Sequence, residues 1–66
     1  MRVFVNGETK EFGGELKLHD LLKHLDIPSE RIAVELNKLV VRRQDWAETD
    51  VRENDTIEIV QFVGGG

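Results

Sequence analysis

The chain has 66 residues and no cysteine, and its 9 Lys and Arg against 13 Asp and Glu give a formal net charge of −4. This length predicts one compact domain, because a chain of about 60 residues buries only about 60% of its unfolded surface and has little room for an enclosed active site. The missing cysteines exclude disulfides, a thiolate nucleophile and cysteine-based metal sites, and they suit a reducing cytoplasm. The acidic balance disfavours nucleic acid and anionic membranes as partners, and no apolar run is long enough to span a membrane.

The first 12 residues predict a β-hairpin. In a strand over residues 1–5, Met1, Val3 and Val5 would lie on one side and Arg2 and Phe4 on the other. Asn6-Gly7 follows as a strong type I′ turn signal. The second strand would cover Glu8 to Phe12, and the glycine pair after it ends regular structure.

The next segment predicts an amphipathic helix. Four leucines recur at helical spacing and form one apolar stripe, at Leu18, Leu21, Leu22 and Leu25. The helix lacks a good N-cap, because Lys17 offers no acceptor, and we expect it to end near Asp26, ahead of Pro28.

The rest of the chain predicts three further strands. Alternation over residues 32–36, the turn Asn37-Lys38 and the short run 39–41 indicate a second hairpin. A polar connection over residues 42–48 carries Trp46, expected as a packing anchor, and the final strand would cover residues 56–63. The order predicts an α+β fold, with a mixed sheet of about five strands and the helix packed on one of its faces.

Strand alternation also predicts a docking surface. Val3 and Val5 in the first strand, and Ile57 and Ile59 in the last strand, are expected to face the helix. Alternation then points Phe4, Val60 and Phe62 away from it. We expect Phe4 and Phe62 to form one contiguous apolar patch that binds a partner. The alternatives are an oligomer interface, or a loop such as the Trp46 segment covering this face.

The chain closes with Gly64, Gly65 and Gly66. Glycine has no Cβ, so such a tail can enter a channel too narrow for other residues, and three extended residues reach roughly 10 Å. We therefore interpret residues 1–63 as the domain, residues 64–66 as a flexible tail, and the Gly66 carboxylate as the functional group. The alternative is a frayed end without a role.

Other chemistry finds little support in the sequence. His19 and His24 would lie about 140° apart around a helix, too far to share a metal ion, so no metal site is expected. Arg42-Arg43 is a minor candidate for contacting a carboxylate or a phosphate. With neither a cysteine nor a phosphate-binding loop, the chain is not expected to be an enzyme.

Four segments together carry a resemblance over the whole chain: VNGE (5–8), LHDLL (18–22), IAVELNKLVVRRQDW (32–46) and NDTIEIVQFVGGG (54–66). They resemble the ThiS family of sulfur carrier proteins of thiamine biosynthesis, within the ubiquitin-like β-grasp proteins. The molybdopterin synthase small subunit is similar in fold and in its Gly-Gly end but is typically longer. Lys17 departs from the Thr or Ser that often caps the family's helix.

The resemblance implies a role for the tail. An adenylyltransferase of the ubiquitin-activating type (ThiF type) would consume MgATP to form an acyl-adenylate at Gly66, with no cofactor bound by the chain itself. A persulfide donor would convert it to a thiocarboxylate, and thiazole synthase (ThiG type) would accept the sulfur. Gly64 and Gly65 would permit threading. The alternatives are another β-grasp sulfur carrier, similar to the molybdopterin synthase small subunit, a ubiquitin-like modifier linked through Gly66 to a lysine, and an interaction module with an inert tail.

Overall fold

The computed structural model describes residues 1–62, so the predicted tail and the boundary at residue 63 lie outside the described part of the chain. It contains a short α-helix, a 3-10 helix and strands that form two sheets. The elements in chain order are β1 (Arg2–Val5), β2 (Glu8–Glu11), β3 (Leu16–Lys17), α1 (Leu18–His24), β4 (Ile32–Leu36), β5 (Leu39–Val41), the 3-10 helix η1 (Arg43–Glu48), β6 (Asp50–Val51) and β7 (Thr56–Gln61).

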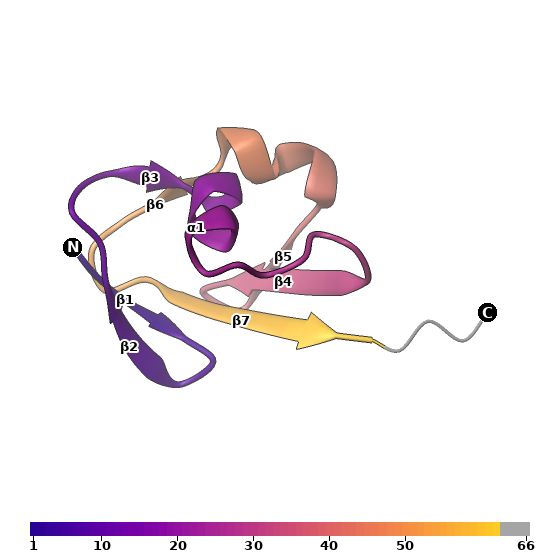
Figure 1. The fold of residues 1–66 in the computed structure, drawn as a ribbon, viewed down its shortest axis with the longest axis horizontal. Helices are drawn as coiled ribbons and strands as arrows, with labels where there is room; N and C mark the ends of the chain where they lie inside the picture. The colour runs from indigo at the N-terminus through magenta and orange to yellow at the C-terminus, as the bar shows by residue number, and fades with distance from the viewer. Residues whose placement is uncertain (63–66) are drawn as a thin grey trace.

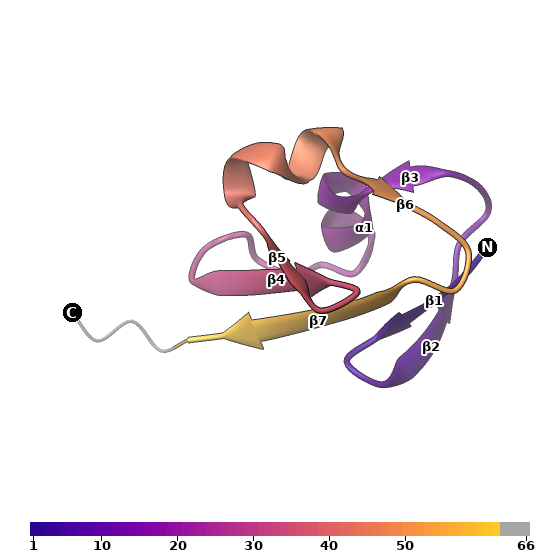
Figure 2. The same ribbon diagram turned by 180° about the vertical axis from the view of Figure 1, so that it is seen from behind.

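The main sheet has the strand order β2-β1-β7-β4-β5. Strands β1 and β7 are parallel and the other neighbours are antiparallel, so the sheet is mixed. Figure 1 shows α1 and η1 on one face of this sheet, and Figure 2 shows the same layering from behind, with no described element on the opposite face. The predicted α+β architecture is confirmed.

Both predicted hairpins are present, and their turns use left-handed backbone angles. The φ angles are 48° at Asn6 and 81° at Gly7, and 51° at Asn37 and 72° at Lys38. Two consecutive residues with positive φ are what a two-residue type I′ turn requires. Such turns match the right-handed twist of the flanking strands, which fixes the register of each hairpin.

Helix α1 buries three of the four predicted leucines, since Leu18, Leu21 and Leu22 are at most 2% exposed. Leu25 lies just after the helix and is partly buried against the core. Lys17 provides no side-chain cap, as predicted, and the Leu18 N–H donates instead to the Thr49 carbonyl at 2.8 Å.

The helix ends in a Schellman motif rather than through Pro28. Asp26 has a φ of 55° and donates its N–H to the Lys23 carbonyl, while Ile27 donates to the Leu22 carbonyl at 3.0 Å.

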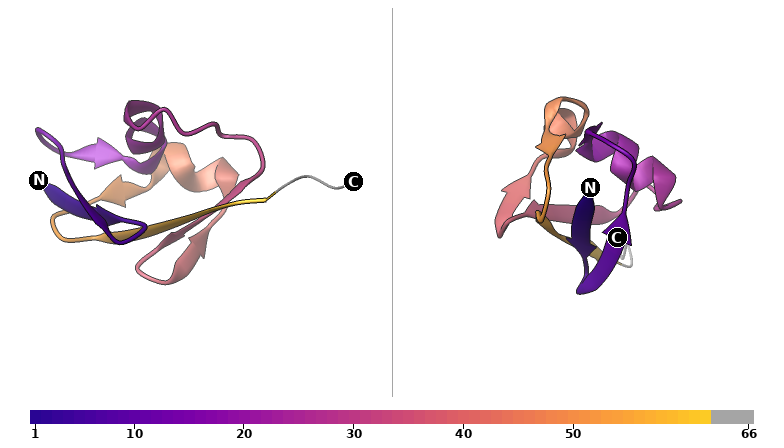
Figure 3. Two further views of the ribbon diagram at one scale, coloured as in Figure 1. Left: turned by 60° about the horizontal axis from the view of Figure 1, so that its bottom comes forward. Right: turned by 90° about the vertical axis from the view of Figure 1, so that its left-hand side faces the viewer.

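The two-stranded sheet of β3 and β6 was not predicted from the sequence. Each strand has two residues, too few to show a periodicity, and Leu16 pairs with Val51. Figure 3 shows this small sheet on the helix side of the main sheet. Within residues 1–62, no helix is long and apolar enough to cross a membrane.

The core lies between the main sheet and α1. Trp46 is 3% exposed and donates its indole N–H to the Val41 carbonyl at 2.9 Å, which confirms its role as a packing anchor. The buried apolar residues of the core are Val3, Val5, Leu18, Leu21, Leu22, Ile32, Val34, Trp46, Val51 and Ile57.

Candidate functional site

The candidate site is β7, the strand that leads directly to the C-terminal residues. It is the central strand of the main sheet, between β1 and β4. Gly64, Gly65 and Gly66 lie outside the described residues. The structure describes the strand before them and the contacts that hold this strand in the sheet.

The backbone groups of β7 alternate between its two neighbours. The Asn37 N–H donates to the Thr56 carbonyl at 2.7 Å, and the Phe62 N–H donates to the Arg31 carbonyl at 2.9 Å. Because antiparallel pairs alternate between hydrogen-bonded and non-bonded positions, the even-numbered residues of β7 bond toward β4. The odd-numbered residues 57, 59 and 61 therefore direct their N–H and C=O groups toward the β1 side.

Strand β1 covers only part of that side, because its pairing with β7 ends at Val5 and Ile57. Asn6 continues the contact through its backbone and its side chain. Its N–H donates to the Ile57 carbonyl at 2.9 Å; its side-chain oxygen accepts from the Ile59 N–H at 2.7 Å, and its side-chain nitrogen donates to the Ile59 carbonyl at 3.1 Å. The Asn6 amide thus takes the place of a strand residue beside β7.

The side chain of Asn37 also bonds to the backbone of β7, on the side of β7 that faces β4. Its side-chain oxygen accepts from the Thr56 N–H at 2.9 Å, and its side-chain nitrogen donates to Asp55 at 3.1 Å. Sequence reasoning identified both asparagines as turn residues and missed that they hold β7. An Asn in a turn beside a central strand is the only sequence signal for this role.

The outer face of β7 carries two of the predicted docking residues. Val60 is 59% exposed and Phe62 is 51% exposed, on the face opposite α1. Trp46 packs in the core on the helix side, so the alternative that its segment covers this face is wrong.

The predicted contiguity of Phe4 with Phe62 is also wrong. Phe4 pairs with Thr56, six residues before Phe62, which places the Cα atoms of Phe4 and Phe62 roughly 20 Å apart at about 3.3 Å per strand residue. The Phe4 side chain is half-buried, with the Arg2 guanidinium 5.8 Å from its ring centroid. The error arose because parallel register cannot be read from alternation alone. Whether Phe4, Val60 and Phe62 dock a partner stays a prediction.

Further exposed groups on the sheet were missed. Leu39 is 73% exposed and Val40 is 70% exposed at the β4–β5 hairpin. Val40 lies opposite Glu35, which in turn lies opposite Glu58 of β7. Like charges directly opposite each other destabilise a sheet, and no described residue forms a salt bridge with either glutamate.

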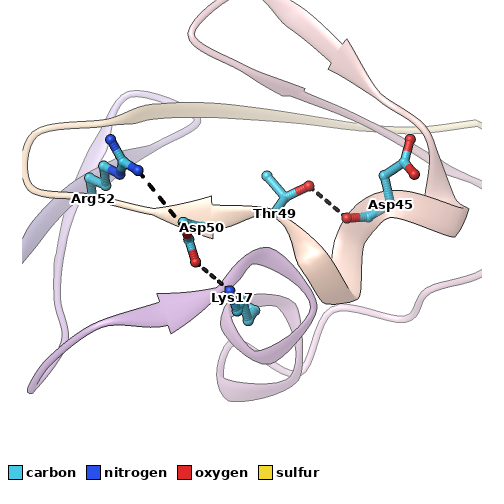
Figure 4. A network of polar contacts seen from close by, with 5 residues as sticks. All are labelled: Lys17, Asp45, Thr49, Asp50 and Arg52. Atoms are coloured by element: carbon cyan, nitrogen blue, oxygen red, sulfur yellow. Dashed lines mark hydrogen bonds and ion pairs between the residues drawn. The ribbon is translucent and has the colours of Figure 1, made fainter.

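An ion pair links the small sheet at the far end of the fold (Figure 4). Lys17 of β3 donates to the carboxylate of Asp50 in β6, and Arg52 lies 4.0 Å from the same carboxylate. The hydrogen bond to Asp50, followed by its charge, raises the pKa of Lys17; the same bond lowers the pKa of Asp50. The figure also shows Thr49 donating to the Asp45 carbonyl at 2.6 Å. These contacts flank the start of α1, because Lys17 precedes Leu18 and the Thr49 carbonyl accepts from the Leu18 N–H.

Arg43, a minor candidate for binding an anion, and His24, which was not expected to bind a metal, both make contacts within the fold. Arg43 donates to the Ser29 carbonyl and lies 5.6 Å from the Trp46 ring centroid, while His24 stacks on Phe12 with ring centroids 6.2 Å apart. Among the described residues, no group of three His, Asp or Glu is placed to hold a metal ion.

Comparison with known proteins gives one consistent family. The family model described as "ThiS family" matches residues 3–66. The sulfur carrier protein ThiS of Escherichia coli is 29% identical over 66 residues, covering all of both chains. A thiazole synthase of Paramagnetospirillum magneticum is 36% identical over 66 residues, and this chain spans only 20% of that protein's length.

A solved structure agrees with the fold. The crystal structure of a thiamine biosynthesis protein (ThiS) from Geobacter metallireducens superposes with a TM-score of 0.88 at 35% identity, covering 100% of each chain. The predicted β-grasp fold is thereby confirmed, and the family match extends through the three terminal glycines. The chain belongs to the ThiS family.

Proposed function

We propose that this chain is a sulfur carrier of thiamine biosynthesis, acting through the carboxylate of Gly66. The observation that carries the proposal is the family match over residues 3–66, which includes the glycine tail. The geometry of β7 is compatible with it. The central strand, held by Asn6 and Asn37, ends at Gln61. Phe62 is the last described residue, and the four residues after it can span at most about 14 Å.

The chemistry requires an activating partner. A C-terminal carboxyl has an ordinary pKa of about 3.3 to 3.7, so it is ionised at neutral pH and resists attack by sulfur nucleophiles. An adenylating enzyme of the ubiquitin-activating type transfers AMP from MgATP to the carboxylate and releases pyrophosphate. A persulfide sulfur then attacks the acyl-adenylate and AMP leaves; reductive cleavage of the resulting acyl disulfide by a thiol leaves the thiocarboxylate.

The sulfur acceptor in this proposal is thiazole synthase. The support is the thiazole synthase of Paramagnetospirillum magneticum, which contains a region similar to this entire chain. The chain itself acts as a protein cosubstrate rather than an enzyme, without a bound cofactor or metal. Val60 and Phe62 contact thiazole synthase beside the tail. Phe4 forms a separate contact on the same face of the sheet, near the start of β7. On the sequence alone, we place this chemistry in the cytoplasm.

A growth experiment tests the proposal against its alternatives. A bacterial strain lacking its own carrier, but retaining the adenylating enzyme and thiazole synthase, receives the full chain or a chain without Gly66. We expect growth without thiamine only with the full chain, and growth of both strains when thiazole is supplied. Restoration by the truncated chain would favour an interaction module with an inert tail. Adducts on lysines, with no rescue of growth, would favour a protein modifier.

A further inference from the structure

Strand β7 has an open edge directly before the tail. The alternation established above directs the N–H and C=O of residues 57, 59 and 61 toward the β1 side. Ile57 is bonded there by the backbone of Asn6, and Ile59 by its side chain. Gln61 is the next residue in this series, and among the described residues β1 and Asn6 reach no further. Figures 1 and 2 show β7 extending well past the end of the β1–β2 hairpin.

The other edges of the main sheet differ from this one. The outer edge of β2 carries Glu8, Lys10 and Glu11, and charged side chains of this kind disfavour pairing with another strand. The opposite edge is β5, which has only three residues. The far half of β7 is instead flanked by the exposed side chains of Val60 and Phe62, and Gln61 is exposed as well.

We propose that the Gln61 edge of β7 pairs with an extended segment of thiazole synthase, so that the sheet of the carrier continues into its acceptor enzyme. This inference rests on the proposed function, because it names the acceptor as the occupant. Strand addition supplies backbone hydrogen bonds, while side chains on the face of the added strand give specificity. Here the added strand would place apolar side chains beside Val60 and Phe62. The edge lies immediately before residues 63–66, so pairing at Gln61 would direct the tail into the enzyme.

A proline at position 61 tests this edge without changing the hydrogen bonds of the rest of the sheet. The Gln61 N–H points away from β4, so Gln61→Pro removes the open donor without breaking a bond between β4 and β7. The matched control is Gln61→Ala, which changes the side chain and keeps the N–H. Binding of each variant to purified thiazole synthase is measured by calorimetry, and folding by the fluorescence of Trp46, the single tryptophan.

We expect Gln61→Pro to weaken binding about fivefold to tenfold, as one lost hydrogen bond predicts, and Gln61→Ala to stay within about twofold. Equal binding by both folded variants would overturn the inference. If Gln61→Pro does not fold, hydrogen exchange in the wild-type chain decides. The Gln61 amide should exchange at least about tenfold more slowly in the complex, with little change at Ile59, which Asn6 already protects. Unchanged exchange at Gln61 would overturn the inference.

Two further outcomes identify what has failed. Self-association of the free chain that Gln61→Pro abolishes would make a second copy the occupant and reject thiazole synthase. Loss of the proposed function would appear differently, as a wild-type chain that does not bind thiazole synthase and accepts no sulfur at Gly66. A wild-type chain that binds and accepts sulfur, while Gln61→Pro has no effect, would leave the proposed function intact and remove only the edge pairing.

Discussion

Replacing Asn6 tests whether its side chain holds the strand that carries the tail. Asn6→Gly removes both side-chain hydrogen bonds to Ile59 and tolerates the φ of 48° at no steric cost. At a net 0.5 to 1.5 kcal/mol for each bond, we expect the free energy of unfolding to fall by about 1 to 3 kcal/mol. Asn6→Ala loses the same bonds and adds a left-handed backbone cost of about 1 to 2 kcal/mol.

Urea unfolding followed by Trp46 fluorescence measures both variants, because Trp46 is 3% exposed in the folded chain. Hydrogen exchange at the Ile59 amide locates the effect, since this N–H loses its acceptor in both variants. The reasoning would be refuted if Asn6→Gly unfolded within about 0.5 kcal/mol of the wild type and Ile59 exchanged at an unchanged rate.

Three other predictions follow from the contacts described. Trp46→Ala should lower the free energy of unfolding by about 3 to 5 kcal/mol, which is comparable with the whole stability of a domain this small. Circular dichroism should therefore show a largely unfolded chain. A native spectrum at 37 °C would contradict the anchor role. Phe62→Ala should keep the melting temperature, because the ring is 51% exposed, and should weaken binding to thiazole synthase about tenfold. Leu39→Ala, at the β4–β5 hairpin, serves as the control. Equal affinities of the two variants for the enzyme would remove Phe62 from the interface. The Lys17–Asp50 pair should stabilise the wild type relative to Asp50→Asn at neutral pH. Because the pKa of Asp50 is lowered, its contribution is present above the ordinary value of 3.8 and lost as pH falls through the lowered value. Because the pKa of Lys17 is raised, its contribution is present below 10.5 and lost as pH rises through the raised value. A constant difference in stability from pH 2 to 12 would contradict the pairing.

Local patterns were sufficient to predict much of the fold. Asn6-Gly7 and Asn37-Lys38 sit in the predicted turns, and the leucine stripe lies against the sheet. These features depend on neighbours close in the chain, where periodicity and turn chemistry act directly. Trp46 was also predicted correctly, because a single large aromatic residue in a small domain is commonly buried.

The errors concern contacts between distant segments. The position of Phe4 beside Thr56 depends on the parallel register of β1 and β7, which alternation does not specify. The sheet of β3 and β6 is too short to be read from a pattern. The contacts of Asn6 with Ile59 join residues 53 positions apart, and the turn signal gives no information about them. Each of these contacts joins residues that lie far apart in the chain.

The glycine tail is where sequence reasoning and the family match agree, and the structure contributes the strand that leads to it. The central claim is that the carboxylate of Gly66 becomes a thiocarboxylate. The most direct test is the intact mass of the chain after incubation with an adenylating enzyme active on another carrier, MgATP and a sulfide source. The account predicts a gain equal to exchanging one oxygen for sulfur, and no such gain when an alanine follows Gly66. An unchanged mass of the wild-type chain would contradict it.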